Sequence, residues 1–160
     1  MVSVSREDLI RRFLAGERNF SGTDIYLESD LSNLNLSGIN MIGTALHELY
    51  LEGTNLSGAN LSNAGMSMVN LENADLTNAN LSGANLFLGY LSNANFTGAN
   101  LTGANLSSAE LKNANFSNAN LSGVDFTDSN LHSANLSGTD LSGTIFGNTI
   151  MPDGSIQSSH

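Results

Sequence analysis

The sequence predicts an all-β solenoid, in which the chain winds into stacked coils behind a short helical cap. Two observations predict this fold class. From Leu31 to Phe146, every fifth residue is Leu, Met or Phe, for 24 positions without exception. Small and polar residues fill the positions between them, so that the unit reads Ala-Asn-Leu-Ser-Gly. An unbroken repeat of one short unit is the sequence signature of a solenoid.

Residues 1–18 break the period and predict the helical cap. Ser5 followed by Asp8 resembles a capping box with Asp in the acidic position, and Gly16 provides a C-terminal stop. We expect this helix to cover the edge of the first coil, because the ends of solenoids generally need covering. A helix that binds a membrane or a partner is the alternative. The apolar stripe of the helix consists of Leu9, Ile10, Phe13 and Leu14.

The repeats occupy residues 19–151, and their period of five requires the chain to turn once per unit. In an α-helix, residues five apart lie about 140° apart around the axis, so the Leu series would spiral over every face. In a flat strand, an odd spacing would place successive Leu residues on opposite faces. Within one unit, Ala and Leu therefore share the inner face, Asn points away and Ser-Gly forms the corner. The resulting core is dry and full, with no cavity for a substrate.

Four units per coil would give corners of about 90°. The aromatic residues agree with this coil, since Phe96 and Phe116 are four units apart, as are Phe126 and Phe146. The chirality of parallel β connections favours a right-handed coil. The predicted core column includes Leu81, Phe96, Leu101, Phe116, Phe126 and Phe146.

Two earlier units, at Phe20 and Ile25, fit the same pattern. The step from Ile25 to Leu31 is one position longer than the repeat, which predicts a one-residue bulge between them. The units together make about six to seven coils. At a ladder spacing of about 4.8 Å, they form a rod roughly 30 Å long.

The repeat resembles that of the pentapeptide repeat proteins, over about residues 19–151. The resemblance implies a right-handed quadrilateral β-helix. The entry Gly-Glu-Arg-Asn-Phe-Ser-Gly (16–22) and the exit Ile-Met-Pro-Asp-Gly-Ser-Ile (150–156) resemble the ends of many cyanobacterial members.

The C-terminal end, unlike the N-terminal one, has no predicted helix. The tail, residues 152–160, begins with Pro152, which can blunt an exposed strand edge. An apolar cluster just before the tail could instead form a homodimer contact, as it does in the quinolone-resistance members that this fold resembles. We leave both interpretations open. The cluster consists of Ile145, Phe146, Ile150 and Met151.

Composition and motifs argue against several classes of function. The net charge of −10 argues against nucleic acids and anionic membranes as partners. Cysteine is absent, as are phosphate-binding glycine loops and any catalytic constellation, so we expect neither an enzyme nor a cofactor. Asp125, Asp128 and His132 are too spread around a square coil to hold a metal. No signal peptide or membrane span is evident, and we expect a cytoplasmic location.

One local departure from the repeat predicts an interaction patch. Where Ser-Gly-Ala-Asn would follow Leu86, the chain has Phe-Leu-Gly-Tyr, and clustered exposed apolar residues indicate a partner site. Glu28, Glu48 and Asp128 flank the patch. The alternative is repacking that compensates for the missing methyl group of Gly89. The candidate residues are Tyr50, Met68, Phe87, Leu88 and Tyr90.

These observations predict a non-enzymatic scaffold or protein-interaction module with an unknown protein partner. The alternative follows from the resemblance, because some members mimic B-form DNA and bind DNA gyrase. Residues 19–151 carry eleven acids and one Lys. Over roughly 30 Å, this is little more than half the charge density of DNA. We therefore favour the interaction module over the DNA mimic.

Overall fold

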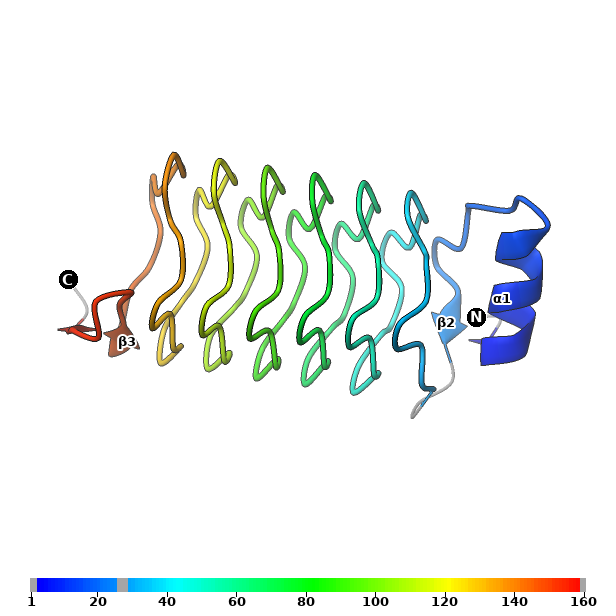
Figure 1. Ribbon diagram of the computed structural model, residues 1–160, viewed down its shortest axis with the longest axis horizontal. Helices are drawn as coiled ribbons and strands as arrows, with labels where there is room; N and C mark the ends of the chain where they lie inside the picture. Colours follow the sequence, from blue (N-terminus) through cyan, green and yellow to red (C-terminus); the bar gives the residue numbers. More distant parts are fainter. Residues whose placement is uncertain (1–2, 26–28, 159–160) are drawn as a thin grey trace.

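The computed structural model describes residues 3–25 and 29–158 as a rod of stacked coils (Figure 1). Strand β1 (Ser3–Val4) and helix α1 (Arg6–Leu14) lie at one end, followed by β2 (Asp24–Ile25). Strands β3 (Thr149–Ile150) and β4 (Ile156–Gln157) lie at the other end. The coils between them consist of isolated parallel bridges, because only one residue of each unit pairs with the next coil.

The bridges show a coil of four units. Asn60, Asn80 and Asn100 pair in succession, and three further series run alongside at the same interval. The first bridge joins Asn19 to Asn40, and the interval between these two residues is one longer than in the other bridges. The register therefore contains one extra residue in the first coil, whereas residues 26–28, where the predicted bulge falls, lie outside the described residues.

A regular corner of the coil is a tight turn with two separate supports. The amide of Ala84 donates to the Leu81 carbonyl at 3.0 Å, and Gly83, just before Ala84, has a φ of +66°. Such a turn favours Gly or Asn at the positive-φ position. The Asn80 side chain does more than point away from the core, because its Oδ1 accepts the amide of Ser82 at 3.1 Å. The Asn, Ser and Gly of the unit thus all serve the corner.

The core is a column of side chains with the layered aromatic order that the sequence indicates. Phe96 stacks on Phe116 with ring centroids 4.8 Å apart, and Phe126 stacks on Phe146 at 5.8 Å. Leu81, Leu101 and the first three of these rings are fully buried. Phe146 continues this column and packs against the core, but it is only half-buried. Among the described residues, no further coil stacks on that layer to complete its burial.

Helix α1 packs against the first coil through part of its stripe. Ser5 accepts the Asp8 amide at 3.2 Å as the N-cap, and Leu9 and Phe13 are buried. The stripe is narrower than predicted, because Leu14 is 79% exposed. Strand β1 pairs in parallel with β2, which occupies one edge of the first coil.

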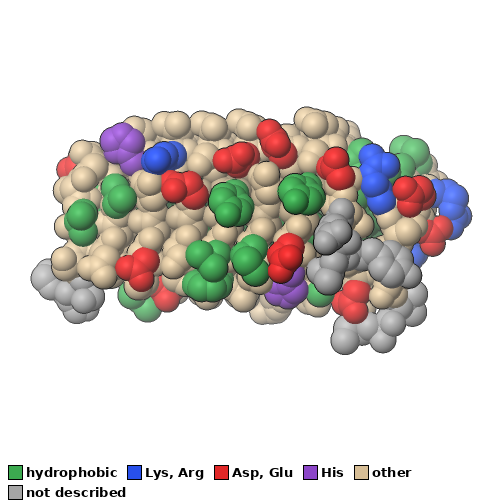
Figure 2. Space-filling view, turned by 90° about the horizontal axis from the view of Figure 1, so that it is seen from below, with side chains coloured by type: hydrophobic (Ala, Val, Ile, Leu, Met, Phe, Trp, Pro, Cys, Tyr) green, Lys and Arg blue, Asp and Glu red, His purple; other side chains and the backbone are tan. Residues whose placement is uncertain are grey.

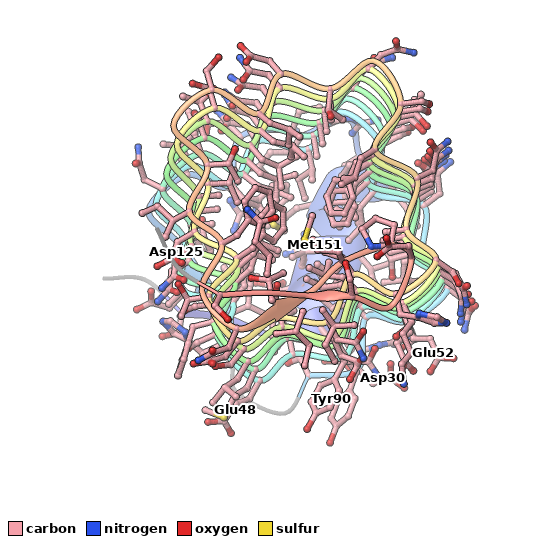
Figure 3. All side chains as sticks on the ribbon, turned by 90° about the vertical axis from the view of Figure 1, so that its left-hand side faces the viewer. Asp30, Glu48, Glu52, Tyr90, Asp125 and Met151 are labelled. Atoms are coloured by element: carbon pink, nitrogen blue, oxygen red, sulfur yellow. The ribbon has the colours of Figure 1, made fainter. Side chains whose placement is uncertain are left out.

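The C-terminal end closes differently. Strand β3 pairs with β4 in an antiparallel hairpin, so the predicted tail folds back on the last coil. The Ser133 amide donates to the Pro152 carbonyl at 2.9 Å, which occupies part of the coil edge. The hairpin crosses this end of the rod, with Met151 near its middle (Figure 3). Leu141, in a position that is buried in earlier coils, is 39% exposed here.

Candidate interaction site

The four sides of the coil differ in how strictly they follow the repeat, and we name them A to D by their bridging residues. Each series continues with one member per coil. Side A begins with Asp30 and Tyr50, side B with Asn35 and Asn55, side C with Asn40 and Asn60, and side D with Ala45 and Gly65.

Departures from Asn or Asp at the bridging position occur on sides A and D alone. Sides B and C have Asn or Asp at all twelve bridging positions between residues 35 and 140. Between residues 30 and 145, sides A and D, which are neighbours, carry all six exceptions. The exceptions are Ala45, Tyr50, Gly65, Tyr90, Glu110 and Ile145.

The corner between sides D and A is equally irregular in its backbone. Glu48, Met68 and Leu88 have φ values of +59°, +55° and +57°. At the other three corners of the coil, the residue in this position is Gly, Asn or Ser throughout residues 33–143. A bulky side chain in this left-handed region costs about 1 kcal/mol relative to Gly, because its Cβ approaches the backbone. We call this column, whose six members recur once per coil from Glu48 to Asn148, the D–A corner.

Tyr50 and Tyr90 also lack a hydrogen bond that supports the corner elsewhere. Between them, Asn70 accepts the Glu72 amide at 3.0 Å, as other bridging Asn residues do. A tyrosine cannot make this bond, and among the described residues no group accepts the amides of Glu52 and Ser92. The two tyrosines therefore do not serve the corner that follows them.

Side A carries a depression of about 350 Å³, which we call the tyrosine depression because Tyr50 and Tyr90 line it. Tyr50 and Tyr90 are 52% and 55% exposed, and both bridge to Asn70 between them. Hydrophobic side chains gather in the middle of this side, with acidic ones around them (Figure 2). Tyr90 and Glu48 project outward from the same side of the coil (Figure 3). The lining includes Glu48, Tyr50, Met68, Asn70, Glu72 and Tyr90.

Repacking around Gly89 does not account for the exposed residues. A Cβ at Gly89 would lie 2.9 Å from the Leu86 carbonyl oxygen, so no space is left for a methyl group. Phe87 and Leu88 have nothing to fill there, and both remain exposed. Gly89 is therefore a requirement of the local backbone.

Another pair of departures does have a packing explanation. The His47 Nδ1 accepts the Ser67 amide at 3.2 Å, and so replaces the acceptor that an Asn at position 65 would supply. A Cβ at position 65 would lie 2.5 Å from the His47 Nε2, so Gly65 leaves room for this placement of the imidazole. This exchange keeps an acceptor for the corner amide, whereas Tyr50 and Tyr90 provide none.

With this geometry established, comparison with known proteins places the chain. The family model described as pentapeptide repeats matches in eight copies, over residues 28–63, 55–87, 90–128 and 109–148. The chain belongs to the pentapeptide repeat family. Proteins of this family fold as right-handed quadrilateral β-helices, and they are generally structural or interaction modules.

Several solved pentapeptide repeat structures are similar to this chain. Rfr23 from the cyanobacterium Cyanothece 51142 is 30% identical over 91% of this chain and 97% of its own, with a TM-score of 0.46. A protein of the Arabidopsis thaliana thylakoid lumen is 33% identical over 66% and 70%, with a TM-score of 0.39. QnrB1, a plasmid-mediated fluoroquinolone resistance protein, is 18% identical over 92% and 90%, with a TM-score of 0.40. No curated protein matches the chain.

The remaining candidate positions lie on different parts of the coil. Asp125 is on side D, Asp128 belongs to the D–A corner and His132 follows side A, and no group of three or more His, Asp or Glu residues in the described part of the chain could hold a metal. Glu28, expected to flank the patch, lies outside the described residues. Within the described segments, no helix has the length and apolar character to cross a membrane.

The C-terminal cluster is exposed unevenly. Ile145 is 52% exposed, whereas Phe146, Ile150 and Met151 are half-buried. Ile145 stands at a bridging position where the pentapeptide repeat has Asn or Asp on most sides, so it is a further departure on side D.

The carboxylates that follow the repeat serve the corners. Donation from the Ser32 amide and hydroxyl lowers the pKa of Asp30 below its usual value. The Ser142 hydroxyl and amide lower the pKa of Asp140 in the same way. Glu48 and Glu72 make no such bond within the described residues, so the depression has acidic groups that the pentapeptide corner does not use.

Proposed function

We propose that this protein is a non-enzymatic protein-interaction module whose binding surface is side A and the D–A corner. The observation that carries the proposal is the exposure of Tyr50, Met68, Leu88 and Tyr90 at positions where the corner favours Asn or Gly. Their apolar surface is open to a partner, and clustered exposed apolar residues mark interaction sites. Binding explains residues that the coil alone does not require.

The distribution of charge supports this proposal over the DNA mimic. Of the nine acids in residues 29–151, six lie on side A or at the two corners that flank it, and sides B, C and D carry one each. DNA presents two continuous rows of phosphates, with one charge per about 1.7 Å of helix axis. A single acidic side around an apolar centre fits a local protein contact better. We expect no inhibition of gyrase supercoiling at micromolar protein, and salt-sensitive inhibition that weakens in Glu52→Gln/Glu72→Gln would promote the DNA mimic instead.

A consensus-restoring variant tests the interaction module. It combines Tyr50→Asn, Met68→Asn, Phe87→Ser, Leu88→Gly and Tyr90→Asn, and it keeps Gly89 because a methyl group does not fit there. The wild type and this variant, each carrying an affinity tag, are compared as baits in lysate of the source cells. We expect proteins captured by the wild type to be lost from the variant, while circular dichroism is unchanged.

Ile42→Ser provides the matched control. Ile42 is an exposed apolar residue at a corner of side C, and Ser restores the repeat there. This control should capture the same proteins as the wild type. Identical capture by all three baits would reject side A as the binding surface.

We further propose that α1 and β1 cap a rod of about six to seven coils, and that the C-terminal end can form a homodimer. Burial of Leu9 and Phe13 supports the cap, and exposure of Ile145 and Leu141 supports the dimer. Ile145→Asn restores the repeat and should convert a dimer into a monomer in light scattering. A wild type that is monomeric at high concentration would instead favour the hairpin as a blunted edge.

A further inference from the structure

We propose that the tyrosine depression binds the cationic side chain of an Arg in an exposed segment of a partner protein. This inference rests on the proposed function and names the chemistry of the partner. The depression combines two tyrosine rings with the carboxylates of Glu48 and Glu72 and the amide of Asn70. Aromatic faces and carboxylates together select a cation.

The spacing of the tyrosines suits such a guest. Tyr50 and Tyr90 lie two coils apart, each bridged to Asn70. Two ladder steps of about 4.8 Å separate their backbones by about 9.6 Å. A cation midway between rings at that spacing would lie about 4.8 Å from each, within the reach of about 6 Å for a cation–π contact.

The carboxylates of the lining argue against anionic and purely apolar guests. An anion would meet Glu48 and Glu72 on a chain with a net charge of −10. A purely apolar guest would bury these carboxylates without a partner, which is costly. A guanidinium group can stack on a ring through its plane and bond a carboxylate through its edge, which an ammonium group cannot do at once.

No Lys or Arg side chain of the described residues supplies this cation. The three ion pairs of the described residues use Asp8, Glu17 and Glu110, not the acids of the depression. Lys112, the one lysine of the chain, lies 4.0 Å from Glu110. The arginines all precede residue 19, in and just after α1. Met68 in the lining adds apolar surface for the methylene stem of the guest.

Titration with defined peptides tests the inference. The probe is acetyl-Gly-Gly-Arg-Gly-Gly-amide, and the comparison peptides replace Arg with Lys or with citrulline, its neutral isostere. Binding is followed by NMR of the labelled protein at low salt. We expect the Arg peptide to shift the Tyr50, Asn70 and Tyr90 signals, the Lys peptide to bind more weakly, and citrulline to bind at least about tenfold more weakly than Arg.

Two acid variants separate the depression from general attraction by the acidic surface. Glu72→Gln removes a carboxylate of the lining, whereas Glu52→Gln removes the same charge one coil earlier, outside the lining. We expect affinity for the Arg peptide to fall severalfold in Glu72→Gln and to change little in Glu52→Gln. Equal losses in both variants, or equal binding of Arg and citrulline, would overturn the inference.

The tyrosines provide the second test, because Tyr50→Asn/Tyr90→Asn restores the repeat and so keeps the fold. This variant should lose at least about tenfold in affinity for the Arg peptide. Retained affinity would also overturn the inference. If the Arg peptide fails to bind the wild type while the consensus-restoring variant still loses its captured proteins, the inference fails and the interaction module stands.

Discussion

The two regular sides of this coil and the two irregular ones show what the repeat is for. On sides B and C, each bridging residue is an Asn or Asp, and its oxygen typically accepts the second amide after it. On sides A and D, six of these residues are replaced, and the D–A corner has bulky residues in the left-handed region. The repeat is strict where the side chains serve only the turn. Where it fails without structural compensation, the surface is open to another role.

The largest expected effect comes from the core, which both regions share. Leu101→Arg or Phe116→Arg would bury an unpaired charge among residues that are fully buried. The cost is about 4 kcal/mol or more, enough to unfold the central coils. Thermal unfolding followed by circular dichroism measures it. An unchanged melting temperature would mean that inside and outside are assigned wrongly.

The second largest loss of stability is expected when a tyrosine pair is placed on a regular side. Asn60→Tyr/Asn100→Tyr places two tyrosines two coils apart on side C, as Tyr50 and Tyr90 are on side A. The amides of Ser62 and Thr102 would lose their Asn acceptors. We expect a loss of about 1–2 kcal/mol in the free energy of unfolding, measured with denaturant. No loss would show that the Asn acceptors matter little on any side.

A smaller effect isolates the backbone of the corner. Gly103 has a φ of +66°, and a Cβ there would meet nothing within 4 Å. Gly103→Leu should therefore cost about 1 kcal/mol through conformation alone, and Gly103→Asn clearly less. Chemical denaturation of the two variants measures the difference. Equal stability of the two variants would contradict the backbone strain that we infer at Leu88.

The smallest expected effect is on the pH dependence of stability. Hydrogen bonds from Ser142 lower the pKa of Asp140 in the folded state, so its charge stabilises the fold above the unfolded-state pKa of about 3.9. That contribution is lost as the pH falls through the lower, folded pKa. Asp140→Asn keeps the acceptor oxygen without titrating. The wild type should exceed this variant slightly in stability at pH 7, and the difference should vanish near pH 2. A difference independent of pH would contradict the assignment.

The architecture follows from the sequence because one short unit recurs without a gap and only a coil with corners can bury all its Leu residues. The patch residues Phe87, Leu88 and Tyr90 were predictable as a break in that unit. The concentration of departures on two sides was also present in the sequence, but it emerges only when residues are sorted by their place in a four-unit coil. Sorting in this way also brings Glu72 beside Tyr50 and Tyr90.

Other features depend on three-dimensional neighbours that periodicity does not specify. Leu141 and Phe146 follow the repeat and yet are not closed in, because burial of a layer requires the next coil. Leu14 lies on the helical stripe but beyond the area that the first coil covers. At position 65, Gly replaces the usual Asn, and His47 in the preceding coil accepts the Ser67 amide instead. This exchange depends on contact between coils.

We propose that the irregular side A serves binding rather than folding. The most direct test is the free energy of unfolding of the variant Tyr50→Asn/Met68→Asn/Leu88→Asn/Tyr90→Asn, measured by urea denaturation against the wild type. Relief of the positive-φ strain and two restored acceptors should offset the lost apolar contacts. We predict a stability equal to the wild type within about 1 kcal/mol, or higher. A loss of more than about 2 kcal/mol would show that these residues support the fold and would contradict the account.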